Sequence, residues 1–345
     1  MKTWNFGIIG AGLIADFHAR AIGDIENAKL IGFTDVIADK ARQLADKHTC
    51  RAFADNEELL HNPDIDIVSI ATPSGAHLEP VVAAALAGKH VICEKPLEIT
   101  LDRVDTMIAA HEKAGTLLGG VFQNRFNEAM GPLREAIRAE RFGKITFAGV
   151  YVPWWREESY YQGSWHGTWK LDGGGALMNQ SIHTIDMLCD LMPPVESVQA
   201  YADHLAHDIE VEDTAVAALR FTNGALGLIY GTTASWPGQF KRFEITGAKG
   251  TVVYVEDSLT VWQFAEEKPE DDGIRQKYGS VQNTGGAVAD PAAISHAGHR
   301  KNFQSFLSAL ETGDDFEISG AEGRKSIELI LAIYQSAKEQ RLVKL

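Results

Sequence analysis

A lysine and a histidine, far apart in the chain, stand in contexts that suit proton transfer. Lys95 follows the apolar run His90–Cys93 and precedes Pro96, which restricts the lysine to extended geometry and can adopt the cis form. An exposed ammonium keeps its proton to a pH of about 10.4, so a lysine is a base only where burial or a nearby positive charge lowers its pKa. Lys95 is therefore a candidate general acid or base, although most lysines that end strands lie at the surface.

His183 follows a second unusual segment, the glycine triplet 173–175. Successive glycines let the backbone bend tightly against another group. Asn179 and His183 come four residues apart in the helical run that follows, so they fall on one helix face. The imidazole can exchange a proton near neutral pH, and the amide can hold a hydroxyl group without competing as a base. A lone histidine on such a helix is usually a core residue, but these neighbours favour a functional role for both side chains.

Aromatic and cationic side chains precede the glycine triplet and could form the wall of a substrate site. Trp155, Arg156 and His166 lie in a stretch rich in tryptophan and tyrosine. Aromatic faces stack on the apolar side of a sugar ring, and Arg156 or His166 could bind hydroxyl or carboxylate groups. The same stretch would equally suit a subunit interface. Arg125, at the end of a predicted strand, either orients the substrate or forms a structural salt bridge between domains.

The elements that position these groups begin with a glycine turn, Gly10-Ala11-Gly12-Leu13-Ile14-Ala15, where an N-terminal strand would pass into a helix. Gly10 and Gly12 let the backbone approach a pyrophosphate, and the amides of the helix that opens at Leu13 and Ile14 would face it. Ala15 replaces the third glycine of the fingerprint, a position that needs only a small side chain. This turn predicts a bound dinucleotide, because an acidic residue also ends the next strand-like run.

That acidic residue is Asp35. Its carboxylate would accept hydrogen bonds from the adenosine ribose and repel a 2′-phosphate, and neither Val36 nor Ile37 supplies an arginine to bind one. NAD is therefore expected in preference to NADP. The alternative is that Asp35 only caps the following helix.

Polar residues also follow another predicted strand, at the edge where ligands bind in open α/β sheets. Thr72, Pro73, Ser74 and His77 are expected to line the nicotinamide ribose. His77 could equally be a residue that starts the next helix.

The first 120 or so residues alternate β-rich runs with helical patterns, the signature of βαβ units on a parallel sheet. Gly88 and Gly115 stand where C-terminal caps of helices belong. The predicted strands are 6–9, 30–34, 67–71, 90–93 and 117–121, and the predicted helices are 14–22, 39–47, 56–61, 78–87 and 101–114. This part is expected to be a doubly wound Rossmann domain over residues 1–125.

Longer alternating strands dominate after about Gly131. They predict a second, α+β domain over residues 126–345 with a large, mostly antiparallel open sheet. A polar stretch, 266–290, is predicted to be a surface excursion. The predicted strands are 144–152, 197–203, 214–221, 225–233, 242–247 and 251–256, and two helical runs, 299–311 and 321–340, follow.

Composition limits the partners. A chain of 345 residues exceeds the usual size of one hydrophobic core, and 45% hydrophobic with 23% charged residues is ordinary for a globular protein. The formal net charge of −15 would repel a phosphate backbone, so no nucleic acid is expected, and no apolar run reaches the roughly 20 residues that span a bilayer. The three cysteines stand singly without zinc-ligand spacing, so no metal site is predicted and a reducing cytoplasm fits best.

These motifs resemble the glucose-fructose oxidoreductase / inositol dehydrogenase / rhizopine catabolism (Gfo/Idh/MocA) family. The resemblance rests on the Gly10 turn, Ala71-Thr72-Pro73, Glu94-Lys95-Pro96 and the run from Gly173 to His183, and it extends over essentially the whole chain. It implies a Rossmann domain and a C-terminal domain whose open sheet commonly forms homodimers or homotetramers. It also implies that Lys95 is the general acid/base, that His183 binds or relays the substrate proton, and that Glu94 lies beside the nicotinamide.

Asn179 departs from the family pattern, since many members carry aspartate there. Lys95 and His183 would then share the proton work, and inositol becomes less favoured than a nucleotide-linked amino sugar or a related glycoside. The leading hypothesis is an NAD(P)-dependent oxidoreductase for a secondary alcohol or ketone of a sugar, sugar derivative or cyclitol. The alternatives are a glycosidase that retains NAD through a transient redox cycle and a non-catalytic sugar or dinucleotide sensor, which would need neither Lys95 nor His183.

Overall fold

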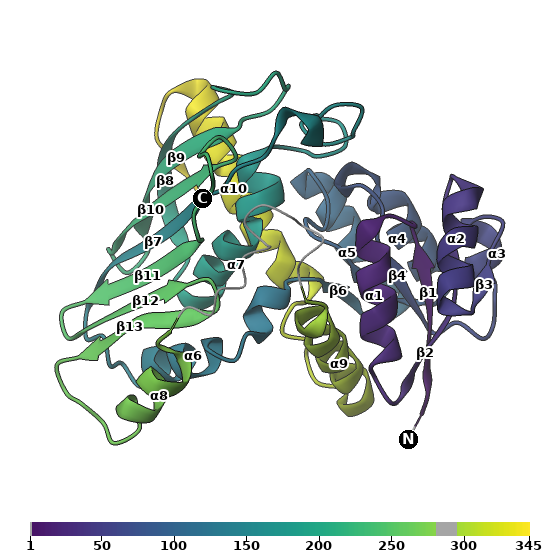
Figure 1. Ribbon diagram of the computed structural model, residues 1–345, viewed down its shortest axis with the longest axis horizontal. Helices are drawn as coiled ribbons and strands as arrows, with labels where there is room; N and C mark the ends of the chain where they lie inside the picture. Colours follow the sequence, from purple (N-terminus) through teal and green to yellow (C-terminus); the bar gives the residue numbers. More distant parts are fainter. Residues whose placement is uncertain (1, 281–294) are drawn as a thin grey trace. The chain divides into compact units, whose positions relative to one another are not determined.

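The computed structural model describes residues 2–280 and 295–345, which fall into two compact units (Figure 1). The first unit contains the described residues of Met1–Gln123, Lys170–Gly173 and Ser295–Ile327. The second contains those of Asn124–Trp169, Gly174–Ile294 and Glu328–Leu345. The chain therefore passes between the units several times, whereas the predicted domains 1–125 and 126–345 have a single crossing.

A parallel sheet of six strands forms the centre of the first unit, in the order β3-β2-β1-β4-β5-β6. Phe6 and Ile8 in the first strand and Ile67 and Val68 in the fourth are fully buried, as expected of strands covered on both faces. The strand order reverses between the first and fourth strands, where open α/β sheets bind ligands. The strands are β1 (Trp4–Ile9), β2 (Ala28–Thr34), β3 (Arg51–Ala52), β4 (Ile67–Ile70), β5 (His90–Cys93) and β6 (Leu118–Gly120).

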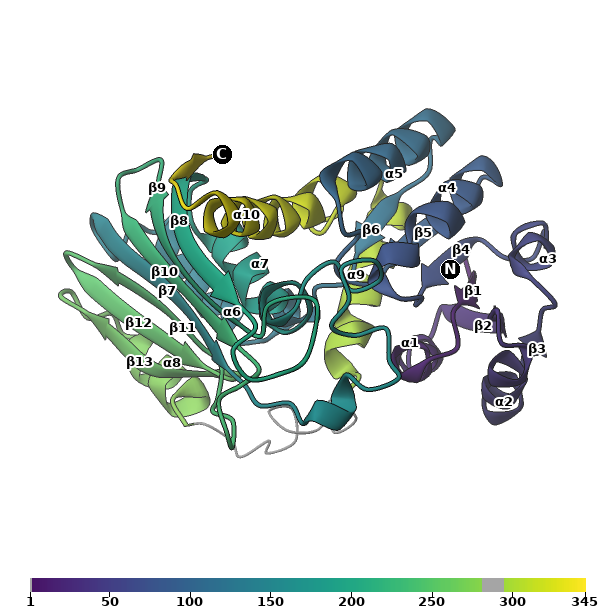
Figure 2. The ribbon, with the colours of Figure 1, turned by 90° about the horizontal axis from the view of Figure 1, so that it is seen from above.

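Helices cover this sheet on both faces. They are α1 (Leu13–Gly23), α2 (Ala38–His48), α3 (Asn56–Leu60), α4 (Leu78–Leu86), α5 (Leu101–Ala114), α9 (Ala297–Thr312) and the start of α10 (Gly320–Glu339). Figure 2 shows α4 and α5 on one face, with α1 and α9 on the other. Left-handed backbone at Gly88 (φ 70°) and Gly115 (φ 66°) confirms the predicted caps of α4 and α5. The predicted strands and helices are present, and β3 was missed because two residues are too short for a pattern.

An eight-stranded sheet forms the centre of the second unit, in the order β13-β12-β11-β7-β10-β9-β8-β14. Neighbours are antiparallel except β7 and β10, which confirms the predicted mostly antiparallel sheet. In the ninth strand, buried Ala215 and Ala217 flank Val216, which is 43% exposed, so only one face of this strand packs on a core. The strands are β7 (Ile145–Pro153), β8 (Val195–Asp203), β9 (Thr214–Phe221), β10 (Leu226–Thr232), β11 (Arg242–Gly247), β12 (Gly250–Val255), β13 (Ser258–Phe264) and β14 (Val343–Lys344).

The helices of the second unit are α6 (Met130–Arg138), α7 (Ile182–Leu191), α8 (Asp271–Tyr278) and the remainder of α10. Part of the predicted surface excursion 266–290 is helical, because α8 lies within it, and residues 281–290 fall outside the described residues. Buried Asp271 anchors α8 by accepting hydrogen bonds from Trp262 Nε1 (2.6 Å) and Arg141 Nη1 (2.7 Å). No helix in the described parts of the chain is long and apolar enough to cross a membrane.

Gly32→Ala should destabilise the first unit, because a Cβ at this position of β2 would lie 2.1 Å from the carbonyl oxygen of Arg51. Overpacking of this kind costs about 1–3 kcal/mol. Gly23→Ala, at the exposed end of α1, is the matched control, since its Cβ would have no heavy atom within 4 Å. Denaturant unfolding should show a lower midpoint for the first variant only, and equal midpoints would contradict the close approach of β2 and β3.

Candidate active site

The glycine turn at the end of β1 packs directly on the loop that follows β4. Gly10 has φ 98°, and a Cβ on it would lie 2.5 Å from the carbonyl oxygen of Ala71. A Cβ on Gly12 would meet no heavy atom within 4 Å, and no side chain caps the start of α1. Leu13 is 56% exposed and Ile14 is half-buried. Only glycine fits at position 10. The opening turn of α1 leaves its backbone amides uncapped, as the binding of a pyrophosphate requires.

Asp35 follows β2 and connects it to the glycine turn. Its Oδ2 accepts a hydrogen bond from the Ala11 amide (2.7 Å), and its Oδ1 accepts one from the Ile37 amide (2.7 Å). A carboxylate can accept about four hydrogen bonds, so both oxygens keep capacity for a ribose. Val36 and Ile37 are exposed, as a position beside a bound adenosine allows.

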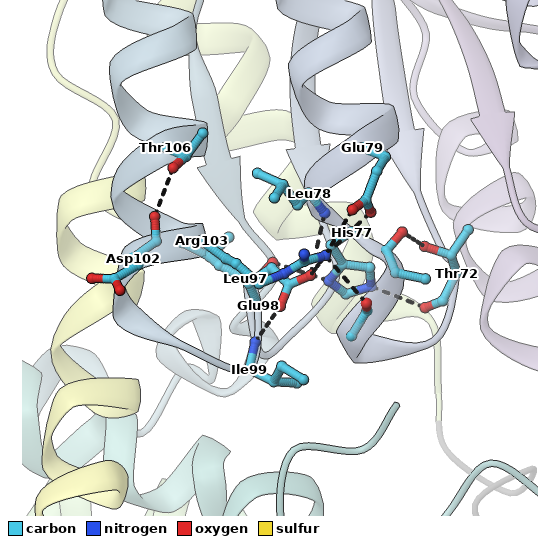
Figure 3. Close-up of polar contacts among 12 residues, drawn as sticks. Thr72, His77, Leu78, Glu79, Leu97, Glu98, Ile99, Asp102, Arg103 and Thr106 are labelled. Carbon is cyan, nitrogen blue, oxygen red and sulfur yellow. Dashed lines mark hydrogen bonds and ion pairs between the residues drawn. The ribbon is translucent and has the colours of Figure 1, made fainter. Parts of the chain in front are cut away.

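The loop after β4 is held by His77, as Figure 3 shows. The buried imidazole places Nδ1 3.0 Å from the carbonyl oxygen of Pro96 and Nε2 2.9 Å from that of Thr72. Ser74 is buried, and Thr72 and Pro73 are half-buried. Because both His77 nitrogens face backbone carbonyls, the geometry favours a role in joining this loop to the turn after β5 over the predicted contact with the cofactor.

A second group of contacts anchors the residues that follow Pro96. Arg103 Nη2 donates to Oε1 of the buried Glu98 (2.8 Å) and reaches Glu79 Oε1 at 3.1 Å (Figure 3). Oε2 of Glu98 also accepts from the Ile99 amide (2.6 Å). The turn that carries Lys95 is therefore fixed on its C-terminal side by charge-assisted hydrogen bonds.

Glu94 and Lys95 follow β5 directly and differ in burial. Glu94 is buried, and its Oε1 lies 2.8 Å from His18 Nε2, whose ring places Nδ1 2.7 Å from Ser69 Oγ. Burial raises the pKa of the Glu94 carboxyl, but hydrogen bonding and attraction from His18 outweigh it and lower that pKa to about 2. Lys95 is half-buried after four buried residues, and its peptide bond to Pro96 is cis. Glu94 thus stays ionised next to the candidate acid/base in the sequence.

His299 of α9 is a third member of this buried cluster. Its Nε2 lies 3.9 Å from Glu94 Oε1, and burial lowers its pKa to about 4. His18, Glu94 and His299 offer ligand atoms within 4.8 Å of one another, a spacing that a metal ion could bridge. A metal would have to displace the direct contact between His18 and Glu94. Sequence reasoning missed both histidines: His18 had one signal, a polar ring on the buried face of α1, and His299 had none.

Asn179 and His183 are on adjacent helical segments of the second unit. Asn179 lies in a π-helical turn, Ala176–Ser181, rather than in the predicted α-helix, and His183 lies in the first turn of α7. From Ala176 to Thr184 these two residues are half-buried and every other residue is buried. Both side chains therefore reach the accessible side of an otherwise enclosed segment, and π-helical turns recur at functional sites.

Arg125 has a different environment from the one predicted for a substrate residue. It is 2% exposed, and its Nε and Nη2 donate to Oδ2 and Oδ1 of Asp186 at 2.7 Å each. Nη1 donates to Asp190 Oδ1 at 3.2 Å. This bidentate buried pair lies within the second unit, so the geometry favours a structural role over contact with substrate.

The aromatic stretch forms a cluster in the second unit. Arg156 is buried, its Nη1 donates to the Trp155 carbonyl (2.8 Å), and its guanidinium lies 5.2 Å from the ring centre of Trp154. The His166 ring stacks on Trp165 with centroids 4.0 Å apart. His166 also lines a cavity of about 330 Å³ together with Glu158, Tyr161, Gln162, Ser164, Gly167, Thr168, Asp208, Ile209 and Glu210.

The predicted site residues are divided between the two units. The glycine turn, Asp35, the loop after β4 and Lys95 belong to the first, and Asn179 and His183 belong to the second. The structure brings the first group to the carboxyl ends of neighbouring parallel strands, the ligand-binding edge of such sheets. The convergence of Lys95 and His183 on one nicotinamide stays a prediction.

Fold and loop geometry together define a dinucleotide-binding α/β protein with a lysine at the ligand edge of its parallel sheet. Residues 4–121 match the profile described as "Oxidoreductase family, NAD-binding Rossmann fold", and residues 132–253 match "GFO/IDH/MocA C-terminal domain". Myo-inositol 2-dehydrogenase of Thermotoga maritima is 30% identical over 99% of this chain and 98% of that protein. The chain belongs to the Gfo/Idh/MocA family of NAD-binding oxidoreductases, which confirms the resemblance and the expected NAD.

Two further relatives bear on the chemistry. The WlbA dehydrogenase from Bordetella pertussis, whose crystal structure is in complex with NADH and UDP-GlcNAcA, is 34% identical with a TM-score of 0.90, and the match covers 100% of this chain and 98% of that one. Levoglucosan dehydrogenase from Pseudarthrobacter phenanthrenivorans is 29% identical over 99% of this chain and 98% of that protein.

Asp35→Ser should weaken NADH binding about tenfold and reduce the preference for NADH over NADPH, because it removes two backbone hydrogen bonds and the charge that repels a 2′-phosphate. Asp39→Ser is the matched control: this exposed carboxylate of α2 lies 3.4 Å from Arg42 and should leave both affinities unchanged. Fluorescence titration with each dinucleotide measures the two constants. An unaltered preference in Asp35→Ser would count against the assignment.

Proposed function

We propose that this chain is an NAD-dependent dehydrogenase or reductase that acts on a secondary alcohol or ketone of a sugar derivative or cyclitol. The observation that supports this proposal most directly is the position of Lys95. It follows β5, is half-buried, and lies at the same edge of the parallel sheet as the glycine turn and the Ala71 loop. A base at this edge stands where the reacting end of a bound dinucleotide is expected. In this proposal the first unit binds the cofactor and the second binds the substrate.

Each candidate side chain then has a role. The bound cofactor would supply the hydride chemistry, with NAD⁺ as the acceptor in alcohol oxidation and NADH as the donor in ketone reduction. Lys95 Nζ takes the hydroxyl proton during oxidation or returns it during reduction, and His183 holds the same hydroxyl and relays the proton. Asn179 holds a neighbouring hydroxyl and carries no charge at any working pH, so Lys95 and His183 share the proton transfer.

Within the sugar derivatives, a nucleotide-linked sugar is the favoured substrate class. Support comes from the likeness to WlbA, whose structure contains UDP-GlcNAcA, and from asparagine at position 179. The aromatic cluster with Trp155, Arg156 and His166 offers faces for ring stacking. A screen of sugars, cyclitols, sugar acids and nucleotide sugars for absorbance change with NAD tests this class. Release of an aglycone without net NADH would instead indicate the NAD-retaining glycosidase.

We also propose that the chain assembles as a homodimer or homotetramer through its eight-stranded sheet and functions in the cytoplasm. Support for assembly comes from exposed apolar side chains on three adjacent strands: Tyr201 is 76%, Val216 43% and Leu226 50% exposed. Support for a reducing compartment comes from the three cysteines, which form no disulfide.

Lys95→Met should lower kcat by about 10³-fold with a change of less than about twofold in NADH affinity, because it removes the proton-transferring amine and keeps the side-chain length. Lys113→Met, at an exposed position of α5 in the same unit, is the matched control and should keep full turnover. Steady-state kinetics on the best substrate and NADH titration provide the two readouts. Retention of more than about a tenth of the turnover by Lys95→Met would exclude the lysine as the acid/base.

A further inference from the structure

One buried residue of the second unit, Glu212, accepts hydrogen bonds from three consecutive backbone amides at the start of the segment that carries Asn179, two through its carboxylate and one through its backbone carbonyl. Glu212 is 4% exposed; its Oε2 accepts from the Gly175 amide (2.9 Å), and its Oε1 accepts from the Leu177 amide (2.8 Å). The amide between them, that of Ala176, donates to the backbone carbonyl of Glu212 (3.1 Å). The first turn of a helix has unpaired N–H groups, and here one residue satisfies three of them.

The glycine triplet is explained by this contact. A Cβ on Gly175 would lie 1.7 Å from the backbone oxygen of Glu212, so the close approach requires glycine. A Cβ on Gly174 would lie 2.2 Å from the hydroxyl of Tyr334, which itself donates to Glu212 Oε1 at 2.9 Å. Two of the three glycines therefore make room for Glu212 and its partner.

The hydrogen bonds continue from Gly175 to the backbone of Asn179. The Gly175 amide donates to Glu212, and the Gly175 carbonyl oxygen accepts from the Asn179 amide at 2.9 Å. The π-helical turn ends at Ser181, and His183 follows in the first turn of α7. A shift of the Gly175–Leu177 backbone would move both half-buried side chains of this segment.

We propose that Glu212 is a positioning residue that fixes Asn179 and His183 for catalysis by binding the Gly175–Leu177 amides. The inference rests on the proposed function, in which those two side chains hold the substrate hydroxyl groups. Displacement of a reacting group by about 1 Å costs about 10²-fold in rate, so a small change in this backbone has a measurable effect.

The contacts of this carboxylate suit its ionised form, since Gly175, Leu177 and Tyr334 all donate to it. Burial raises the pKa of Glu212 to about 7, and hydrogen bonds from Leu177, Gly175 and Tyr334 partly offset it. All of these donors need an acceptor, whereas a glutamine at position 212 would turn one NH₂ group toward an N–H or O–H donor. Glu212→Gln therefore keeps the side-chain size and removes part of the anchor, by which we mean the hydrogen bonds from the Gly175–Leu177 amides and the Tyr334 hydroxyl to Glu212.

The experiment compares Glu212→Gln with Glu256→Gln in the full-length enzyme. Glu256 is also 4% exposed in the second unit, and its Oε1 and Oε2 accept from the backbone amide (2.9 Å) and Nζ (2.6 Å) of Lys241. Glu212→Gln should speed hydrogen exchange of the 175–181 amides about tenfold and lower kcat per folded molecule about 10²-fold, with NADH affinity unchanged. Glu256→Gln should change neither exchange in that segment nor kcat, even if its melting temperature falls.

A second variant covers the case in which Glu212→Gln does not fold. Tyr334→Phe removes one donor and keeps the ring, so it should speed exchange of the same amides and lower kcat by a smaller factor, about threefold to tenfold. If Glu212→Gln is unfolded and Tyr334→Phe is unchanged in both readouts, the inference is overturned. It is also overturned if Glu212→Gln folds and matches Glu256→Gln in exchange and turnover.

His183→Asn separates this inference from the proposed function. If His183→Asn keeps full turnover while Glu212→Gln loosens the 175–181 amides, the proposed role of His183 fails and the anchor itself stands. If His183→Asn loses turnover and Glu212→Gln keeps it, the positioning role of Glu212 fails.

Discussion

The close approach of two backbone loops is the constraint on which the ligand edge of the first unit depends. Gly10 and Ala71 come so near that a Cβ on Gly10 would lie 2.5 Å from the Ala71 carbonyl oxygen. The turn after β1 and the loop after β4 therefore pack with no side chain between them, and the start of α1 stays open. Because β5 lies beside β4, Glu94 and Lys95 leave the sheet at the same edge. The order of the strands thus determines that the glycine turn, the Ala71 loop and Lys95 lie at the same ligand-binding edge.

Each unit has a buried carboxylate near its candidate catalytic residues in the sequence or in the hydrogen-bond network, Glu94 in the first and Glu212 in the second. The hydrogen-bond partners of the two carboxylates give them different pKa values. Burial is the largest influence on both and raises both pKa values. The hydrogen bond from His18 and attraction from nearby cationic groups lower the pKa of Glu94 to about 2, whereas the donors to Glu212 among the described residues are neutral and burial raises its pKa to about 7. Glu94 is thus ionised at every working pH. Glu212 depends on its backbone partners to keep its charge.

The fold was largely predictable from the sequence, because hydrophobic periods and glycine caps are local signals. The βαβ alternation and the lysine at the end of β5 needed only short windows of residues. Pairings between distant residues had no such signal: Arg125 binds Asp186, and α9 returns to the first unit with His299. The π-helical turn around Asn179 was also missed, and the contact of its first amides with Glu212 joins residues 35 and 37 positions apart, which leaves no signal in a short window.

The central claim is that Lys95 and His183 act on the same substrate hydroxyl at one nicotinamide ring. A crystal structure of the enzyme with NAD and a bound substrate or unreactive analogue measures this directly. The account predicts Lys95 Nζ and a His183 ring nitrogen both within hydrogen-bond reach, about 3 Å, of the oxygen on the reacting carbon. A complex in which either nitrogen points away from that oxygen, with the dinucleotide fully bound, would contradict it.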